Sequence, residues 1–454
     1  MEQQSFIDII HEYFSLVSDV DPLYVKWLSA QLLGHLLTKK SFVNINPEVE
    51  RVNLYTLLVG DSYYARKSVT QDMISYFYPI TAFLPNESSA EKFIANLSKI
   101  PNGVWLYGEY SKILKHIKRG GYLSTIAETL NDLYKYERPE YKRELMKDEY
   151  IIKEPYPTFS TTLTPEVLKE QVTPEMMDGG LFGRLMLIPG KKGKGKRESI
   201  PEKAVKLKEE IKEITNALQL SDLSCEFVFN DDSLKRLNDI EGELRKNEDI
   251  AAIAGRYGQA IIKLSAIIAF SEKIGDILTM DEDGYLRSGE ESNNSNNSKK
   301  SKESNNSKIN SSTDIGEDLL RITFITIITN FTILTIFDRH LNEAYEMVKP
   351  CLELARDLKE HVSMNKKFII KAKQYIKENH PVLRSETARM CNIDKLEMDT
   401  AEYTLVDHDF LKVITFQKKK SNGALSKPIV VYCVKNSDKK CSDCEYRKYC
   451  EEDD

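Results

Sequence analysis

The chain has 454 residues, of which 41% are hydrophobic and 30% are charged, and its formal net charge is -6 at pH 7. This balance is that of a globular protein with two to four domains, and the overall charge gives no indication of nucleic-acid binding. The seven cysteines exclude a disulfide framework, because three stand apart and four lie within the last 22 residues. We therefore expect a reducing compartment and a cytoplasmic protein.

The first part of the chain changes from a helical to a strand-rich pattern. Residues 1–43 repeat apolar residues at intervals of three and four, which predicts an N-terminal helical segment. This segment lacks the basic region and long apolar core of a signal peptide. In residues 44–195 helices alternate with buried strands, whose sequences are "VNLYTLLVG", "VWLY", "YPTFSTTL" and "LFGRLMLIP". Such alternation predicts an α/β domain with a mostly parallel sheet covered by helices.

The middle of the chain is predicted to be a helical domain with a long insertion. Helical periodicity covers residues 196–285 and resumes in 314–365. The Asn/Ser/Lys-rich residues 286–313 between them offer almost nothing that could bury a core, so we predict disorder there. The apolar run Ile322–Phe337 has 16 residues, against the ~20 that a membrane span needs. We predict a buried strand or helix in this run, and no membrane contact.

Residues 366–435 are predicted to form a winged helix-turn-helix. Three helical segments precede a Lys-rich hairpin with an Asn-Gly turn, and lysines and arginines outnumber acidic residues by seven between positions 366 and 440. In this topology the third helix enters the major groove of DNA and the hairpin contacts phosphates. Because the third helix is acidic, the expected DNA contacts are Arg384, Arg389, Lys418, Lys419, Lys420 and Lys427. Protein binding is the alternative role of such a domain.

The tail, residues 436–454, holds most of a cysteine cluster. Cys441 and Cys444 form a C-x2-C pair, Cys450 follows after five residues, and Cys433 stands eight positions before Cys441. Four thiolates at this spacing predict a tetrahedral zinc site or an iron–sulfur cluster. The alternative is a set of tail thiols without a ligand role.

A candidate phosphate-binding loop follows the first predicted strand. The stretch "GDSYYARKS" contains Gly60, Asp61, Ser62, Arg66, Lys67 and Ser68 directly before a predicted helix. Helix N-termini bind anions, and in such loops a lysine neutralises phosphate charge while a Ser hydroxyl holds Mg²⁺. The consensus G-x-x-x-x-G-K-[ST] is not met, because one residue is inserted and Arg66 replaces the last glycine. We expect Arg66 to require a different turn and to add a phosphate contact; the alternative is an ordinary strand-to-helix turn.

Three further residues are candidates for catalysis. Glu109 follows the strand "VWLY", where a nucleotide site needs an acidic residue, although Gly108 stands in place of the usual aspartate. In "FSTTLTPEVL", Thr161 or a neighbouring hydroxyl is a candidate sensor of the γ-phosphate, although Thr is common in strands. Arg184, beside a glycine-rich turn, is either a structural residue or an arginine finger that reaches the nucleotide of a neighbouring subunit.

These motifs resemble, in order and spacing, a large uncharacterised family of P-loop ATPases. Members of that family resemble RecA-type helicases and occur with primase and helicase modules of phages, plasmids and archaeal mobile elements. The resemblance covers approximately residues 30–270 and 339–362, and in that family the loop often ends in Arg-Lys-Ser or Arg-Lys-Thr. It implies a RecA-like core, ATP binding by Lys67 and Ser68, Glu109 as the acidic residue, and Arg184 as the arginine at the last strand.

Three functions follow as hypotheses. The leading one is an ATP-binding and ATP-hydrolysing DNA motor or helicase-like protein of mobile-element replication, in a hexamer-type homo-oligomer with ATP and Mg²⁺ as cofactors. The second is a winged-helix DNA-binding regulator on a vestigial P-loop scaffold. The third is a nucleotide-gated protein-interaction module. No dinucleotide-binding motif and no Ser–His or Cys–His arrangement favours another class of enzyme.

Overall fold

The computed structural model divides the chain into two compact units, Met1–Leu358 and Lys359–Asp454, which are treated separately below. The residues that it describes are 4–37, 41–45, 48–62, 65–86, 89–119, 122–134, 140–144, 149–173, 176–177, 179–191, 193, 200–221, 223–247, 250–280, 286–288, 333–379, 381–407, 411–417 and 426–434.

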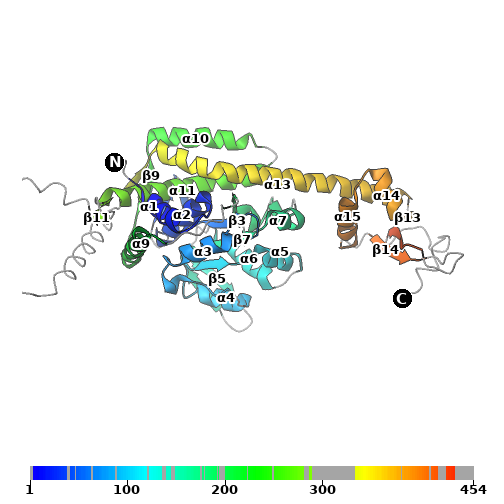
Figure 1. The fold of residues 1–454 in the computed structure, drawn as a ribbon, viewed down its shortest axis with the longest axis horizontal. Helices are drawn as coiled ribbons and strands as arrows, with labels where there is room; N and C mark the ends of the chain where they lie inside the picture. Colours follow the sequence, from blue (N-terminus) through cyan, green and yellow to red (C-terminus); the bar gives the residue numbers. More distant parts are fainter. Residues whose placement is uncertain are drawn as a thin grey trace, which may run out of the picture. The chain divides into compact units, whose positions relative to one another are not determined.

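The first unit contains most of the regular structure (Figure 1). Its helices are α1 (Phe6–Val17), α2 (Pro22–Leu37), α3 (Lys67–Ser75), α4 (Ala90–Leu97), α5 (Tyr110–Arg119), α6 (Tyr122–Leu133), α7 (Pro165–Gln171), α9 (Glu202–Leu220), α10 (Asp231–Arg245), α11 (Ala251–Ile277) and the start of α13 (Asp338–Asn379), with 3-10 turns η1 (Ile80–Ala82) and η2 (Phe182–Arg184). Its strands are β1 (Phe42–Asn44), β2 (Val49–Glu50), β3 (Tyr55–Val59), β4 (Val104–Tyr107), β5 (Glu140–Glu144), β6 (Glu149–Lys153), β7 (Thr158–Leu163), β8 (Met186–Pro189), β9 (Glu226–Phe229), β10 (Leu278–Met280), β11 (Leu286–Ser288) and β12 (Ile333–Ile336).

The four strands predicted from the alternating pattern form one parallel sheet in the order β4-β7-β3-β8. Every residue of β3 and of β7 is buried, as expected for strands covered by helices on both faces. The chain passes from β3 to β4 and then returns to insert β7 between them. The candidate phosphate loop therefore leaves the middle of the sheet, where the strand order changes direction, and this is where open α/β sheets bind ligands.

The predicted N-terminal helices are an integral part of this unit. A capping box starts α1, in which Ser5 accepts from the Asp8 backbone N–H at 3.2 Å. Helix α2 is buried over almost its whole length, and Figure 1 shows α1 and α2 between the long helix α11 and the region of β3. Because α2 is buried on nearly all sides, its apolar residues surround the helix and are not confined to one face.

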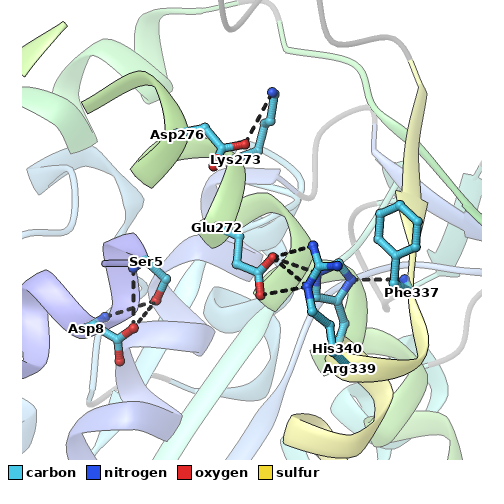
Figure 2. Close-up of polar contacts among 8 residues, drawn as sticks. All are labelled: Ser5, Asp8, Glu272, Lys273, Asp276, Phe337, Arg339 and His340. Atoms are coloured by element: carbon cyan, nitrogen blue, oxygen red, sulfur yellow. Dashed lines mark hydrogen bonds and ion pairs between the residues drawn. The ribbon is translucent and has the colours of Figure 1, made fainter. Parts of the chain in front are cut away.

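A second sheet has the order β12-β9-β1-β2. Its strands β1 and β2 are neighbours in the sequence, whereas β9 and β12 come from distant parts of the chain. Figure 2 shows the polar contacts between α11 and the residues that follow β12. After β12 ends, Arg339 donates to Glu272 of α11 at 2.9 Å and the His340 Nε2 lies 2.8 Å from the same carboxylate. The Phe337 backbone N–H donates to Nδ1 of His340 at 3.0 Å. Nδ1 is thus an acceptor, so Nε2 carries the proton and donates to Glu272.

The predicted insertion and apolar run are only partly described. Residues 286–288 were assigned to the disordered insertion, but they form β11, which pairs antiparallel with β10. Residues 289–313 lie outside the described residues. Within the run Ile322–Phe337, residues 333–336 form β12 and residues 322–332 lie outside the description. Over the described parts of the chain, no helix combines the length and apolar character needed to cross a membrane.

The second unit contains the end of α13, α14 (Arg384–Cys391), α15 (Lys395–Asp407) and a sheet of β13 (Val382–Leu383), β14 (Leu411–Phe416) and β15 (Ile429–Val434) in the order β13-β15-β14. The predicted order of three helical segments and a hairpin is present. Its core contains Ala372, Ile376, Met398, Ala401 and Tyr432. The first predicted helix is not a separate one, because α13 runs on without a break from the preceding unit.

Candidate nucleotide site

The phosphate loop is fixed at the carboxyl edge of the parallel sheet. The Gly60 backbone N–H donates to the Leu163 carbonyl at 3.2 Å, and the Gly190 N–H donates to the Val59 carbonyl at 2.8 Å. The residues that follow β3 and β8 are therefore bonded to the last residues of β7 and β3, respectively. Residues 63–64 lie outside the described residues, and α3 begins at Lys67.

Arg66 adopts a left-handed backbone conformation, with φ 48° and ψ 33°, at the N-cap of α3. This is the conformation that glycine adopts without steric cost and that other L-residues rarely adopt. The expectation that Arg66 requires a different turn was wrong, since this residue takes the backbone conformation for which the consensus glycine is suited. The guanidinium lies 2.7 Å from the Asp19 carboxylate, a partner that the sequence did not reveal.

Lys67 turns its ammonium group back onto its own loop. Its Nζ donates to the Gly60 carbonyl, and to the Asp61 carbonyl at 3.2 Å, while the residue is only 8% exposed. Burial lowers the pKa of Lys67 from its ordinary value, and the negative charges of Asp61, Glu166 and Glu109 oppose this shift. The ammonium therefore lies at the start of α3, where a phosphate oxygen could replace the carbonyls as its acceptor.

The start of α3 also offers donors to an anion. The first N–H groups of a helix have no partner within it, and the helix dipole is positive at this end. Ser68 in this first turn is exposed, and so are Asp61 and Ser62 of the loop. Backbone N–H groups, a lysine and an accessible hydroxyl thus occur together, which fits a phosphate group with its magnesium ion.

Two glutamates flank the loop from neighbouring strand ends. Glu109 is exposed directly after β4 and Gly108, as predicted, and Glu166 is exposed in the first turn of α7 after β7. Glu166 was missed, although "TLTPE" carries a signal: Thr164 caps α7, accepting from the Val167 N–H at 3.4 Å. A cap directly after a buried parallel strand places the next residues at the sheet edge. Within the described residues, no group of three or more His, Cys, Asp or Glu side chains is arranged to hold a metal ion.

The hydroxyls of β7 differ in their placement. Thr161, the predicted sensor, is 0% exposed, and its Oγ1 has no hydrogen-bond partner among the residues that the structure describes. Thr162 donates instead to the Gly108 carbonyl, beside Glu109. Because side chains alternate between the two faces of a strand, a shift of one position along β7 moves a hydroxyl to the opposite face of the sheet. Of these two hydroxyls, the one of Thr162 bonds to the backbone of the residue that precedes Glu109.

Ser160 belongs to a buried polar chain that leads from α3 to α2. It accepts from Thr56 and from Gln71 of α3, each at 2.9 Å. Gln31 of α2 donates to the Leu54 carbonyl at 3.0 Å and to Thr56 Oγ1 at 3.1 Å. Polar groups buried in a protein are usually hydrogen-bonded, and these bonds connect α3 to the sheet and to α2.

Arg184 lies at the other end of the sheet from the phosphate loop. It ends η2 just before β8, where Met186 pairs with Thr56 at the start of β3, whereas the loop follows the end of β3 roughly 15 Å away along the strand direction. Arg184 donates to Asn131 of α6, and to the Gly180 carbonyl at 2.9 Å. These contacts hold Arg184 away from the loop of its own chain, and its role as an arginine finger toward a neighbouring subunit stays a prediction.

The candidate DNA contacts of the second unit are only partly described. Arg384 is engaged within the unit, since it pairs with Asp399, and with Glu402 at 3.2 Å. Arg389 and Lys427 are exposed, whereas Lys418, Lys419 and Lys420 lie outside the described residues. Of the predicted metal ligands, Cys433 lies on β15, and Cys441, Cys444 and Cys450 lie outside the described residues.

Comparisons with known proteins add no family. No protein-family model matches the chain, and no curated protein matches its sequence significantly. The expectation of a RecA-like ATPase therefore depends on the motifs and on the site described above.

Proposed function

We propose that the chain binds ATP at the loop between β3 and α3 and hydrolyses it, as a helicase-like, DNA-associated motor with a RecA-like core. The observation that carries the proposal is the position of Lys67. Its ammonium is withdrawn from water at the start of α3 and bonds to carbonyls of its own loop. A buried cation held mainly by carbonyl oxygens is suited to exchange them for the charged oxygens of a phosphate.

The neighbouring groups support a hydrolytic role. Lys67 and the N–H groups of α3 would hold the phosphates, and Ser68 would hold a magnesium ion, which supplies charge neutralisation on the phosphate oxygens when it is bound. Glu109 would orient and polarise the attacking water, while Thr162 fixes the Gly108 carbonyl beside it. Glu166 is a second carboxylate whose charge acts on Lys67.

Association with DNA is the part of the proposal that rests on the second unit. The order of its elements and the exposed Lys427 and Arg389 support it. The acidic helix α15 is unsuited to a phosphate-lined groove, and Arg384 is already paired with acids of this helix. The hairpin and α14 are therefore the proposed DNA-contacting elements.

Nucleotide binding and turnover in variants of the loop test the proposal. We expect Lys67→Ala to weaken ATP binding ~10- to 100-fold, since it removes a charged hydrogen-bond donor worth about 1.5–3 kcal/mol. Glu109→Gln should retain binding but lower turnover ~100-fold or more. Lys92→Ala is the matched control, because Lys92 is an exposed lysine of α4 away from the loop.

The same assay with single-stranded and duplex DNA separates the hypotheses. DNA-stimulated turnover that Lys67→Ala abolishes is the result expected of a motor. A regulator on a vestigial scaffold would instead be supported if the protein binds ATP without turnover and if its DNA affinity is unchanged in Lys67→Ala. Absence of ATP binding by the wild-type protein would refute the proposal.

A further inference from the structure

We propose that Asp19, in the corner between α1 and α2, is a positioning residue for the phosphate loop: it holds Arg66 in the left-handed conformation from which α3 starts. The inference deepens the proposed function, on which its effect on nucleotide binding rests. Asp19 is far from the loop in sequence and carries no motif.

The backbone of Arg66 needs such a restraint. Its φ of 48° is one of few positive values at a non-glycine residue among the described parts of the chain. An L-residue pays steric free energy in this region and stays there only when its surroundings hold it. The Arg66 carbonyl is then fixed as the acceptor of the Thr70 backbone N–H and of the Thr70 hydroxyl, each at 3.0 Å. The start of α3 therefore depends on this one residue.

The Arg66 side chain is held by a partly buried ion pair. Its Nη1 lies 2.7 Å from Asp19 Oδ1, and the two side chains are only 20% and 15% exposed. Ser18 adds its Oγ at 3.5 Å as a weak acceptor. Because water and salt screen such a pair less than a surface pair, the carboxylate can offset the strain of the arginine backbone.

The α1–α2 corner is itself anchored to the strands that surround the loop. Asp21 accepts from the Lys191 backbone N–H at 2.6 Å, and the Tyr24 hydroxyl donates to the Val59 carbonyl at 2.7 Å. A Cβ at Gly190 would lie 2.0 Å from the Tyr24 ring, and one at Gly193 would lie 2.8 Å from the Asp19 carbonyl oxygen. These two glycines allow the corner to pack closely on the chain after β8. The corner that carries Asp19 is therefore held in place, so its carboxylate can restrain the Arg66 side chain.

A double-mutant cycle tests whether Asp19 acts through Arg66. The measurements are the Kd of a fluorescent, non-hydrolysable ATP analogue and the Tm of the nucleotide-free protein, for wild type, Asp19→Ala, Arg66→Gly and the double variant. We expect Asp19→Ala to weaken binding about tenfold, which corresponds to about 1.4 kcal/mol. In the Arg66→Gly background the same change should alter Kd less than twofold, because glycine needs no restraint.

The Tm values test the restraint without nucleotide. Arg66→Gly removes strain in both backgrounds but breaks the ion pair only when Asp19 is present, so it should raise Tm more in the Asp19→Ala background. Glu12→Ala is the control, since Glu12 of α1 forms a 2.8 Å ion pair with Lys203 of α9 instead of the loop; it should leave Kd unchanged in both backgrounds.

Equal effects of Asp19→Ala in the two backgrounds, on Kd and on Tm, would overturn the inference while leaving the proposed function standing. If the wild-type protein does not bind the analogue, the proposed function fails, and the Tm cycle alone decides whether Asp19 holds Arg66.

Discussion

Lys263 of α11 and Glu50 of β2 form an ion pair that is almost wholly withdrawn from water. The two side chains are 0% and 2% exposed, and the Lys263 Nζ lies 3.9 Å from Glu50 Oε2. The ammonium also donates to the Asn53 side chain at 3.1 Å and lies 3.9 Å from the centre of the Tyr134 ring. Buried charges are tolerated only with such partners. The pair therefore joins α11 to the chain that leads into β3.

We predict that Lys263→Met lowers the free energy of unfolding by ~3–5 kcal/mol, because it leaves the Glu50 carboxylate buried without its cation. Urea unfolding measures the change. Lys273→Met is the control on the same helix, since Lys273 pairs with Asp276 at the surface and such pairs contribute ~0–1 kcal/mol. Similar losses in both variants would contradict the prediction.

Among single residues of the site, the sequence identified those whose role is local. Lys67 and Ser68 begin the helix that follows the loop after a buried strand, and this order along the chain is enough to locate them. The sensor role of Thr161 stays a prediction, because the choice among the β7 hydroxyls depends on which face of the strand each occupies. Asp19 and Glu166 were missed because their proximity to the loop arises from packing between segments that are distant in the chain.

At the scale of elements, β12 and α13 meet α11 through the Glu272, Arg339 and His340 cluster (Figure 2). Burial lowers the pKa of His340, and the hydrogen bond to Glu272 and the charge of that carboxylate only partly oppose this. Burial would raise the pKa of Glu272, but hydrogen bonds from Arg339 and His340 outweigh it and lower that pKa. Glu272 thus remains ionised near neutral pH, while His340 is neutral.

We predict that this junction loses stability as the pH falls below ~6.5, the ordinary pKa of histidine. Because the pKa of His340 is lower in the folded protein, the unfolded chain binds the proton more readily. Stability is then fully present above pH ~6.5 and decreases as the pH falls through the folded pKa. Chemical unfolding of wild type and His340→Gln between pH 5 and 7.5 measures it. An equal pH dependence in both proteins would assign the titration to other groups.

Helices α14 and α15 are joined by the Arg384 pairs with Asp399 and Glu402. Glu402 in turn accepts from the buried Tyr432 of β15. Arg384 therefore links both helices to the strand, which explains why the acidic residues of α15 lie beside a basic one. Because the Arg384 guanidinium is engaged in these contacts, it is less available for the DNA contact that the sequence predicts.

We predict that Arg384→Ala lowers the stability of the second unit by ~1.5–3 kcal/mol through loss of charged hydrogen bonds and leaves the DNA affinity of the folded protein unchanged. Lys427→Ala should instead weaken DNA binding across sequences and reduce its salt slope by about one. Calorimetry and DNA titrations at several salt concentrations test both. A sequence-selective loss of affinity in Arg384→Ala would restore it as a DNA contact.

At the scale of the whole molecule, the chain forms two compact units, each with buried apolar residues of its own. Leu264 of α11 is 0% exposed in the first unit, and Leu405 of α15 is 2% exposed in the second. Chains with separate cores commonly unfold in more than one transition. The candidate nucleotide site lies wholly within the first unit.

We predict two thermal transitions and a selective effect of core truncation on each. Leu405→Ala should lower the stability of one transition by ~2–5 kcal/mol without changing the Kd for ATP. Leu264→Ala should lower the free energy of unfolding in the other transition by a similar amount. Scanning calorimetry with and without an ATP analogue checks this, because a ligand raises only the Tm of the unit that binds it. A single transition shifted by both variants would show one cooperative unit.

The sequence by itself determined the four strands of the parallel sheet, the position of the candidate phosphate loop and most of the helices, because periodicity and chain adjacency are local properties. It did not reveal the sheet of β12, β9, β1 and β2, whose strands are too short to show a period and in which β9 pairs with β1 and β12 across long sequence distances. Only the tertiary structure decided that Arg66 takes the glycine-like conformation with Asp19 as its partner. The physical reason is that strain at one residue is offset by contacts from another segment, and nothing in the local sequence records such contacts.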